Sequence, residues 1–315
     1  MKGRILVTPR SLSSGANSGL QPLVDAGYAL SFPAPGKMPS EAELLAAVPT
    51  CAGWLAGVEP VSDAVVAAAG QLKVISRNGT GVDNLPLSAL AKRGVVVRRA
   101  EGTNARGVAE LALAMSFAGL RHLVPTHSGI SAGGWPRRMG REICNAKVAV
   151  VGLGAVGSQF ARFAVALGAR VFGYDPAALG DGVALPNFYR VELEEALRGA
   201  DVVSLHAPLP ADGLSLLAHD ELAYLARGAV VVNTARAGLV DPTAMLAALN
   251  NGQVGAYATD VFETEPPSID DLLSHSNVLL TSHIGGYTAE SVERTTEVAV
   301  ANLLEVLEGH AHRAC

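Results

Sequence analysis

Five side chains in the second half of the sequence have the types that acid–base chemistry needs. Arg236, Asp260 and His283 each follow, within four residues, an apolar run that reads as a buried strand, and Glu263 and Glu265 lie in the loop after Asp260. An arginine can hold a substrate carboxylate, and a histidine exchanges protons near neutral pH. Because ligands of parallel sheets bind beyond the carboxyl ends of the strands, we expect these side chains to converge there.

A glycine-rich turn lies upstream, within residues 147–175. This stretch reads as a strand, the turn Gly152-Leu153-Gly154-Ala155-Val156-Gly157, a helix to Leu167, a second strand and a terminal acid. In such a unit Gly152 permits the tight turn, Gly154 lets the backbone approach a pyrophosphate, and Gly157 lets the helix pack closely on the strand. The order of elements therefore predicts a dinucleotide site, and a βαβ unit without a ligand is the alternative.

The acid that ends this stretch indicates which dinucleotide binds. Asp175 lies at the distance, about 20 residues on, at which a carboxylate bonds the ribose 2′-hydroxyl. It would repel a 2′-phosphate, and Pro176, Ala177 and Ala178 offer no arginine to hold one. The sequence therefore favours NAD over NADP, with the pyrophosphate at the N-terminus of the following helix.

Together these residues suit hydride exchange between a 2-hydroxy acid and its 2-oxo acid. The nicotinamide exchanges hydride at C2, and a histidine takes or returns the hydroxyl proton. A nearby carboxylate would stabilise the imidazolium, and an arginine would hold the substrate carboxylate. Positioned acid–base help is worth roughly 10²–10⁴ in rate, so the loss of His283 should be costly.

Composition limits the other possibilities. The chain has 315 residues, 49% hydrophobic and 17% charged, which allows two domains with sizeable cores. A net charge of −5 gives no general attraction to nucleic acid or to an anionic membrane. The three cysteines, Cys51, Cys144 and Cys315, are far apart, which indicates a reducing compartment and no metal site. No apolar run reaches transmembrane length, so we expect a cytoplasmic protein.

Strands alternate with helices along the whole chain, which predicts an α/β protein with doubly wound parallel sheets. The expected strands are 5–7, 29–32, 53–57, 72–76, 95–97, 147–151, 170–174, 202–205, 229–232, 255–259 and 278–280. The expected helices include 20–26, 40–48 with a capping box at Ser40 and Glu43, 63–69, 86–93, 103–120, 191–197, 221–226, 242–249 and 288–307. Residues 122–145 read as irregular, and Trp135 within them as a packing residue.

Seven stretches occur in the order of one known family: 77–84 (RNGTGVDN), 108–110 (VAE), 152–157 (GLGAVG), 206–209 (HAPL), 233–241 (NTARAGLVD), 260–266 (DVFETEP) and 283–286 (HIGG). The chain thereby resembles the D-isomer-specific 2-hydroxyacid dehydrogenases, whose members include D-3-phosphoglycerate dehydrogenases. The resemblance implies that Arg236, Glu265 and His283 are catalytic, and its Glu-Pro pattern selects Glu265 over Glu263. It implies no metal.

The resemblance also implies the binding residues. The cofactor-binding residues would be Gly152, Gly154, Ala155, Val156, Gly157, Asp175, His206, Pro208, Thr234, Ala235, Asp260 and Gly285. The backbone N–H groups of Asn78 and Gly79 would bind the substrate carboxylate. Arg77 is either a solvated loop charge or a contact to a substrate phosphate or carboxylate, and Arg137 and Arg138 either face solvent or complete an anion site across a dimer. Ala155 replaces an arginine or lysine that is common in relatives, which leaves the pyrophosphate to backbone groups and the helix dipole.

An architecture follows from the same resemblance. Residues 1–100 and 285–315 would form a flavodoxin-like substrate domain, into which a Rossmann NAD domain, 101–284, is inserted, with the active site in the cleft between them. A homodimer built on the NAD domain would suit the apolar helix 103–120. The sequence ends just after its last expected helix, so no C-terminal regulatory domain is expected.

Several functions stay open at this point. The leading hypothesis is an NAD-dependent D-2-hydroxyacid dehydrogenase, with 3-phosphoglycerate and 3-phosphohydroxypyruvate as the best single pair of substrates. Glyoxylate, hydroxypyruvate or another 2-oxo acid is the alternative. A rival from another class is a non-catalytic NAD(H)-sensing interaction protein of the co-repressor kind, because some relatives of that kind keep the same three catalytic residues.

Overall fold

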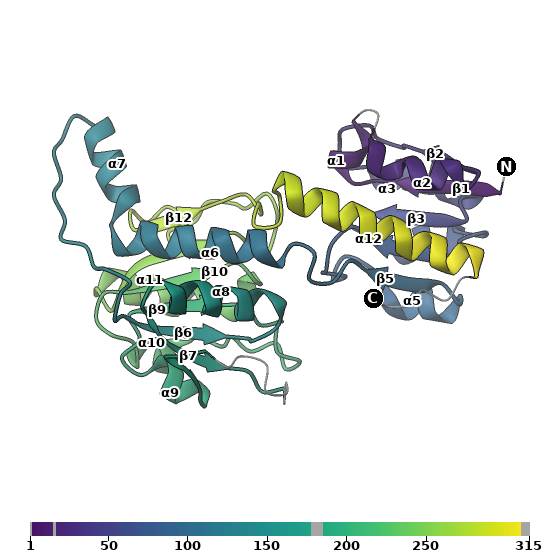
Figure 1. The fold of residues 1–315 in the computed structure, drawn as a ribbon. Helices are drawn as coiled ribbons and strands as arrows, with labels where there is room; N and C mark the ends of the chain where they lie inside the picture. The colour runs from purple at the N-terminus through teal and green to yellow at the C-terminus, as the bar shows by residue number, and fades with distance from the viewer. Residues whose placement is uncertain (1, 15–16, 178–184, 310–315) are drawn as a thin grey trace. The chain divides into compact units, whose positions relative to one another are not determined.

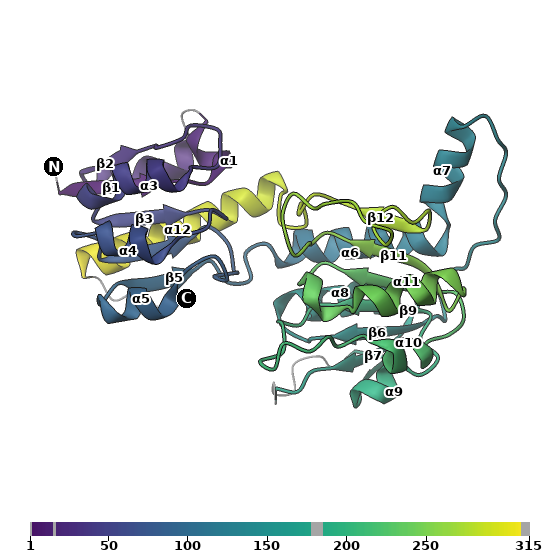
Figure 2. The same cartoon turned by 180° about the vertical axis from the view of Figure 1, so that it is seen from behind.

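The chain folds into two compact units, which the computed structural model describes for residues 2–14, 17–177 and 185–309. The first unit comprises Met1–Asn104 and Ala289–Cys315, and the second comprises Ala105–Thr288, compared with boundaries expected after residues 100 and 284. Figure 1 and Figure 2 show both units from opposite sides.

The first unit is built on a five-stranded parallel sheet of order β2-β1-β3-β4-β5. Its strands are β1 (Gly3–Val7), β2 (Tyr28–Ser31), β3 (Gly53–Ala56), β4 (Val74–Arg77) and β5 (Val96–Arg99). Its helices are α1 (Arg10–Ser13), η1 (Ser18–Leu20), α2 (Gln21–Asp25), α3 (Glu41–Ala47), η2 (Val48–Thr50), α4 (Asp63–Ala68), α5 (Leu87–Lys92) and α12 (Ala289–Glu308).

Helices cover both faces of this sheet. The C-terminal helix α12 lies along one face, against β3, β4 and β5, and α3, α4 and α5 cover the other face (Figures 1 and 2). Successive residues of β1 point to opposite faces, so Ile5 packs in the core under α12 and Leu6 in the core with Trp54. Burial on both faces explains why these strands read as continuous apolar runs.

The second unit contains a seven-stranded parallel sheet of order β12-β11-β10-β9-β6-β7-β8. Its strands are β6 (Lys147–Val151), β7 (Arg170–Tyr174), β8 (Phe188–Arg190), β9 (Val202–Leu205), β10 (Ala229–Asn233), β11 (Val254–Thr259) and β12 (Val278–Leu280). Its helices are α6 (Ala105–Leu120), α7 (Leu123–Ser131), α8 (Ala155–Ala166), α9 (Leu193–Leu197), α10 (His219–Ala223), η3 (Ala237–Leu239) and α11 (Pro242–Asn250). Helices α6 and α8 cover one face, and α9, α10 and α11 cover the other (Figures 1 and 2).

The doubly wound α/β architecture is confirmed, as is the capping box at Ser40 and Glu43. The expectation of an irregular segment at residues 122–145 was wrong for Leu123–Ser131, which form α7, and holds for 132–145, which contain no helix or strand. No residue of α7 is buried, so the helix lacks the apolar periodicity by which sequence reveals helices. Strand β8 was missed because none of its three residues is buried, so it lacks the apolar run that marks the other strands.

None of the described helices is long and apolar enough to cross a membrane alone. Helices α6 and α7 meet that length and composition only as a pair, which bends by 64° at its break.

Candidate active site

The three strands that precede the candidate catalytic residues are neighbours in the second sheet. Strand β10 pairs with β11, and β11 pairs with β12, so that Asn233 lies beside Thr259 and Thr259 beside Leu280. Arg236, Asp260 and the loop that carries His283 therefore start from one sheet edge.

The imidazole of His283 pairs with the carboxylate of Glu265. Its Nδ1 lies 2.9 Å from both carboxylate oxygens, and the N–H of Phe262 donates to Oε1 at 3.2 Å. About half of the His283 side chain is exposed, 49%, so Nε2 remains available to a ligand while Nδ1 faces the carboxylate. With Nδ1 protonated towards Glu265, this arrangement suits a proton exchange at Nε2.

The loop that carries His283 is fixed by Asp260. The buried carboxylate accepts bonds from the Thr281 hydroxyl at 2.6 Å, from the Ile284 N–H at 2.8 Å and from the Gly285 N–H at 2.7 Å. His283 itself has a positive φ of 55°, a left-handed conformation that residues other than glycine adopt uncommonly. Asp260, which we expected among the cofactor-binding residues, thus holds the loop in the conformation that turns His283 towards Glu265.

Arg236 is held by a side chain whose role the sequence did not reveal. The fully buried Asn233 donates from Nδ2 to the Arg236 carbonyl at 2.8 Å and accepts from the Ala235 N–H at 3.1 Å. The guanidinium of Arg236 donates to the Ala235 carbonyl at 2.7 Å. Asn233 therefore closes the turn after β10 and sets the direction in which Arg236 leaves it.

The glycine-rich turn follows β6, and its three glycines meet different surroundings. A Cβ on Gly157 would lie 1.9 Å from the Gly152 carbonyl oxygen, and one on Gly152 would lie 2.6 Å from the Ala207 nitrogen. A Cβ on Gly154 would meet nothing within 4 Å. Gly152 and Gly157 are thus required by packing, and Gly154 leaves open space at the N-terminus of α8, where Ala155 and Val156 begin the helix.

Asp175 faces this turn from the end of β7. One carboxylate oxygen accepts from the Leu153 N–H at 2.7 Å and the other from the Ala177 N–H at 2.9 Å. The carboxylate is thereby fixed next to the turn, where the expected ribose contact places it.

Among the described residues of the second unit, two buried polar side-chain atoms lack a protein partner, one beside the turn and one after β10. These are Nδ1 of His206 and Oγ1 of Thr234. On its other side the His206 ring contacts the Ser204 hydroxyl, with Nε2 and Oγ 2.9 Å apart. The residue as a whole is partly exposed, but burial lowers the pKa of His206 to about 3, which keeps the ring neutral. Such unsatisfied groups fit a polar cofactor, because a bound dinucleotide would complete their hydrogen bonds.

The three expected substrate residues lie in the first unit, at the end of β4. Arg77 is the last residue of β4 and is only 8% exposed, so it is not a solvated loop charge. Its Nη1 donates to the Asn78 carbonyl at 2.9 Å. The N–H of Asn78 bonds the Ala56 carbonyl at 2.8 Å, and the N–H of Gly79 bonds the Arg77 carbonyl at 2.9 Å. A substrate carboxylate would have to replace these two bonds to be held there.

The remaining candidates lie apart from this arrangement. Arg137 and Arg138 are exposed in the segment after α7, and Arg138 bonds Asn277 at 3.2 Å. Trp135, expected to pack, is 80% exposed instead. Pro208 is exposed in the loop after β9.

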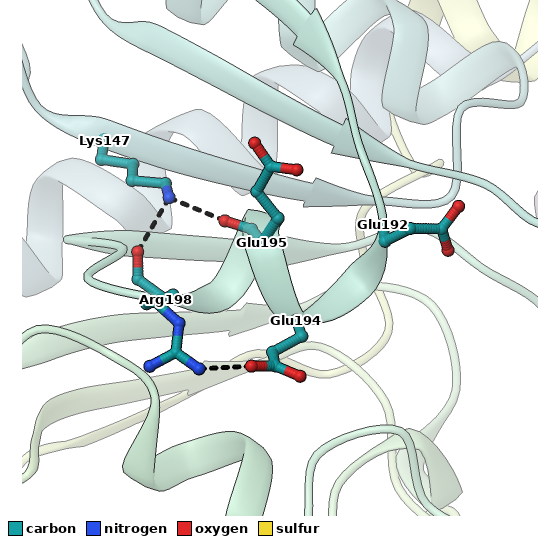
Figure 3. Close-up of a pocket in the computed structure, with 5 residues that line it drawn as sticks. All are labelled: Lys147, Glu192, Glu194, Glu195 and Arg198. Atoms are coloured by element: carbon teal, nitrogen blue, oxygen red, sulfur yellow. Dashed lines mark hydrogen bonds and ion pairs between the residues drawn. The ribbon is translucent and has the colours of Figure 1, made fainter.

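A cavity of about 360 Å³ lies at the amino-terminal end of β6, beside α9 (Figure 3). Lys147, the first residue of β6, donates there to the carbonyls of Glu195 and Arg198 at 2.7 and 2.8 Å, and Arg198 pairs with Glu194. The Lys147 ammonium thus satisfies carbonyls at the C-terminal end of α9, which is a structural role. Among the described residues, no group of three or more His, Cys, Asp and Glu side chains could hold a metal ion.

Comparison with known proteins places the chain in a family. The family model of the D-isomer specific 2-hydroxyacid dehydrogenase NAD binding domain matches residues 113–285, more than half of the 315 residues. The chain therefore belongs to the D-isomer-specific 2-hydroxyacid dehydrogenase family, and NAD is the cofactor of the matched domain. The resemblance inferred from the seven motifs is confirmed.

Individual relatives agree with this assignment. The chain is 37% identical over 265 residues to D-3-phosphoglycerate dehydrogenase of Mycobacterium leprae and 34% identical over 252 residues to that of Methanocaldococcus jannaschii. These alignments cover 83% and 78% of this chain but 50% and 47% of those enzymes, so the chain spans about half their length. The solved structure of the TT0316 protein from Thermus thermophilus is 34% identical, with a TM-score of 0.85 over 97% of both chains.

The anchoring role of Asp260 predicts faster amide exchange in its absence. In Asp260→Asn an NH₂ group replaces one carboxylate oxygen and cannot accept a hydrogen bond. In one orientation of the amide the bond from Gly285 is lost, and in the other the bonds from Ile284 and Thr281 are lost. We expect hydrogen exchange of the peptide that spans residues 283–286, measured by mass spectrometry, to accelerate at least about tenfold, as for a lost hydrogen bond to a charged group. Asp241→Asn, which replaces the N-cap of α11 by another good cap, is the control and should leave this peptide unchanged. Unchanged exchange in Asp260→Asn would refute the anchor.

The neutral ring of His206 predicts a dependence of stability on pH. Unfolded His206 takes up a proton below about pH 6.5, whereas folded His206 does so only near pH 3, so the unfolding free energy falls as pH decreases between these values. In urea unfolding the wild type should lose up to about 1.4 kcal/mol per pH unit more than His206→Asn between pH 6 and 4. Above pH 7.5 the two curves should run parallel. Parallel curves at all pH values would contradict this account.

Proposed function

We propose that the protein catalyses the NAD-dependent interconversion of a D-2-hydroxy acid and its 2-oxo acid. The pairing of Glu265 with His283 carries the proposal, because it leaves one imidazole nitrogen available beside an acid that stabilises the protonated ring. Bound NAD(H) would supply or accept the hydride at C2 of the substrate.

The side chains of the chain then have separate tasks. His283 takes the proton of the substrate hydroxyl at Nε2 in one direction and returns it in the other. Glu265 orients the ring through Nδ1 and stabilises the imidazolium. Arg236, directed by Asn233, binds the substrate carboxylate. Gly154 and the first N–H groups of α8 hold the pyrophosphate, and Asp175 bonds the ribose.

The substrate within this class has two candidates. The names of the curated relatives favour 3-phosphoglycerate and 3-phosphohydroxypyruvate. The burial of Arg77 favours acids without a phosphate, such as hydroxypyruvate or glyoxylate, because a buried guanidinium offers little surface to a phosphate.

Loss of NADH absorbance on a panel of 2-oxo acids measures the proposed activity. His283→Ala should lower kcat by about 10²–10⁴ on the best acid, because the proton donor is lost. Glu265→Gln keeps an acceptor for Nδ1 but removes the negative charge, so we expect an intermediate loss of about tenfold or more. His127→Ala, which removes an exposed histidine of α7, is the control and should retain the wild-type rate.

Two outcomes of this experiment would count against the proposal. A fully active His283→Ala would refute the assigned proton transfer. No turnover of any acid by the wild type, with NADH binding retained, would favour the non-catalytic NAD(H)-sensing protein instead.

We also propose that the protein is a homodimer formed through its second unit. Helix α7 and the segment after it stand away from the rest of that unit in both views (Figures 1 and 2), and no residue of α7 is buried. Large apolar side chains are exposed along them: Leu123 at 54%, Ile130 at 50%, Trp135 at 80% and Met139 at 95%. Exposed apolar groups of this number favour burial against a second copy.

A cytoplasmic location also stays a proposal, drawn from the few, dispersed cysteines.

Sedimentation velocity tests the dimer. The double variant Trp135→Ser with Met139→Ser should shift the protein from a dimer towards a monomer, because it removes two of the most exposed apolar side chains of α7 and the segment after it. Ile269→Ser, which changes an exposed apolar side chain elsewhere in the same unit, should leave the sedimentation unchanged. A monomeric wild type at micromolar concentration would contradict the proposal.

A further inference from the structure

An arginine from strand β8 lies at the turn that carries Asp175. Strand β8 pairs with β7 in such a register that its last residue, Arg190, lies beside Gly173, two residues before Asp175. Nη2 of Arg190 donates to the Asp175 carbonyl at 3.1 Å and also to the Ala177 carbonyl. The guanidinium is therefore held against the same short turn as the acid, and both belong to the second unit.

The carboxylate of Asp175 is fixed at this turn by its own hydrogen bonds. Its two oxygens accept from the N–H groups of Leu153 and Ala177 at 2.7 and 2.9 Å. Ala177 is thus shared, because its N–H bonds the carboxylate of Asp175 while its carbonyl bonds the guanidinium of Arg190. Both charged groups therefore lie at the end of β7, where the proposed function places the adenosine ribose of the cofactor.

Two opposite charges at this place act oppositely on the two dinucleotides. A carboxylate accepts from the ribose 2′-hydroxyl of NAD and repels the 2′-phosphate of NADP, which carries nearly two negative charges at neutral pH. A guanidinium attracts that phosphate, and its planar fork of N–H groups fits the phosphate oxygens. The residues that directly follow Asp175 include no such cation, but sheet pairing brings Arg190 to the turn from 15 residues further on.

The bonds of Arg190 to the turn position its charge and do not remove it. The residue is exposed, and both bonds come from Nη2, one of the three guanidinium nitrogens. Because the positive charge is spread over the whole guanidinium, its attraction for a phosphate persists while the carbonyls hold it.

We propose that Arg190 is a specificity-determining residue of the cofactor site, which binds the 2′-phosphate of NADP when the negative charge of Asp175 is removed. Asp175 and Arg190 thus set the choice of cofactor together: the acid favours NAD, and the arginine limits how strongly NADP is rejected. The inference rests on the ribose contact of Asp175 in the proposed function and adds to that site a second residue from a different strand.

Dissociation constants of NADH and NADPH, measured by isothermal titration calorimetry, test this role without any turnover. We define the NADPH preference as the Kd of NADH divided by the Kd of NADPH, and the wild type should have a value below one. Asp175→Asn keeps one acceptor oxygen but removes the charge, so the NADPH preference should rise at least about tenfold. The further change Arg190→Met, which removes the guanidinium but keeps a long side chain, should reverse most of that rise.

Two more variants of Asp175→Asn separate binding of the 2′-phosphate from support of the turn. Arg190→Lys keeps the positive charge and should retain part of the rise that Arg190→Met abolishes. Arg170→Met removes an exposed arginine at the opposite end of β7 and should leave the NADPH preference unchanged. If Arg190 only supported the turn, its loss would weaken both cofactors equally and would not alter the preference.

Each contrary result overturns a defined claim. An NADPH preference that does not rise in Asp175→Asn, or that stays high when Arg190→Met is added, overturns the role of Arg190 while the dehydrogenase function stands. If Asp175→Asn fails to fold, Asp175→Ser, with a hydroxyl that also accepts one hydrogen bond, provides the uncharged background. A wild type that binds NADH but reduces no 2-oxo acid overturns the proposed function, and the titrations still decide the role of Arg190.

Discussion

A buried carboxylate needs hydrogen-bond donors, and Asp260 finds three of them in one loop. Its bonds to Thr281, Ile284 and Gly285 hold the loop after β12 in a shape that the backbone would not adopt alone, with His283 at a positive φ. The pairing of His283 with Glu265 depends on that shape. Parallel pairing of β10, β11 and β12 brings Arg236 to the same edge, so the proposed catalytic arrangement depends on sheet register and one anchoring acid.

The cofactor side of the same sheet follows a similar logic. Gly152 and Gly157 are required by backbone contacts, whereas Gly154 borders open space, and Asp175 is fixed by the N–H groups of Leu153 and Ala177. Ala155 adds no cation to the turn, so backbone N–H groups and the dipole of α8 are left to meet the pyrophosphate. The unsatisfied atoms of His206 and Thr234 are further groups that a dinucleotide would complete.

Much of this arrangement could be predicted from the sequence because it depends on local pattern. Strands buried on both faces read as apolar runs, and residues that follow adjacent parallel strands must share an edge. Boundaries were harder to predict. Strand β4 ends at Arg77, one residue later than expected. The Arg77 side chain is therefore buried in the strand and does not lie in a solvated turn.

The features that sequence could not reveal depend on contacts between distant residues or on surface that remains uncovered. Glu59 is a lone acid in a loop, and its burial depends on contacts that include Thr8, 51 residues earlier in the sequence. Sequence reasoning expects large apolar side chains to be buried, but no residue of helix α7 is buried, and Trp135 is exposed. Asn233 was visible as a polar residue after β10, but its bonds to the Arg236 turn were not.

Transfer of deuterium from the cofactor to the product tests the central claim most directly. With NADH carrying deuterium at C4 and the best 2-oxo acid of the panel, nuclear magnetic resonance of the isolated product reports both the label and the configuration at C2. The account predicts one deuterium at C2 of the D-2-hydroxy acid. A product that stays unlabelled when each of the two C4 positions is labelled in turn, or a product of the L configuration, would contradict it.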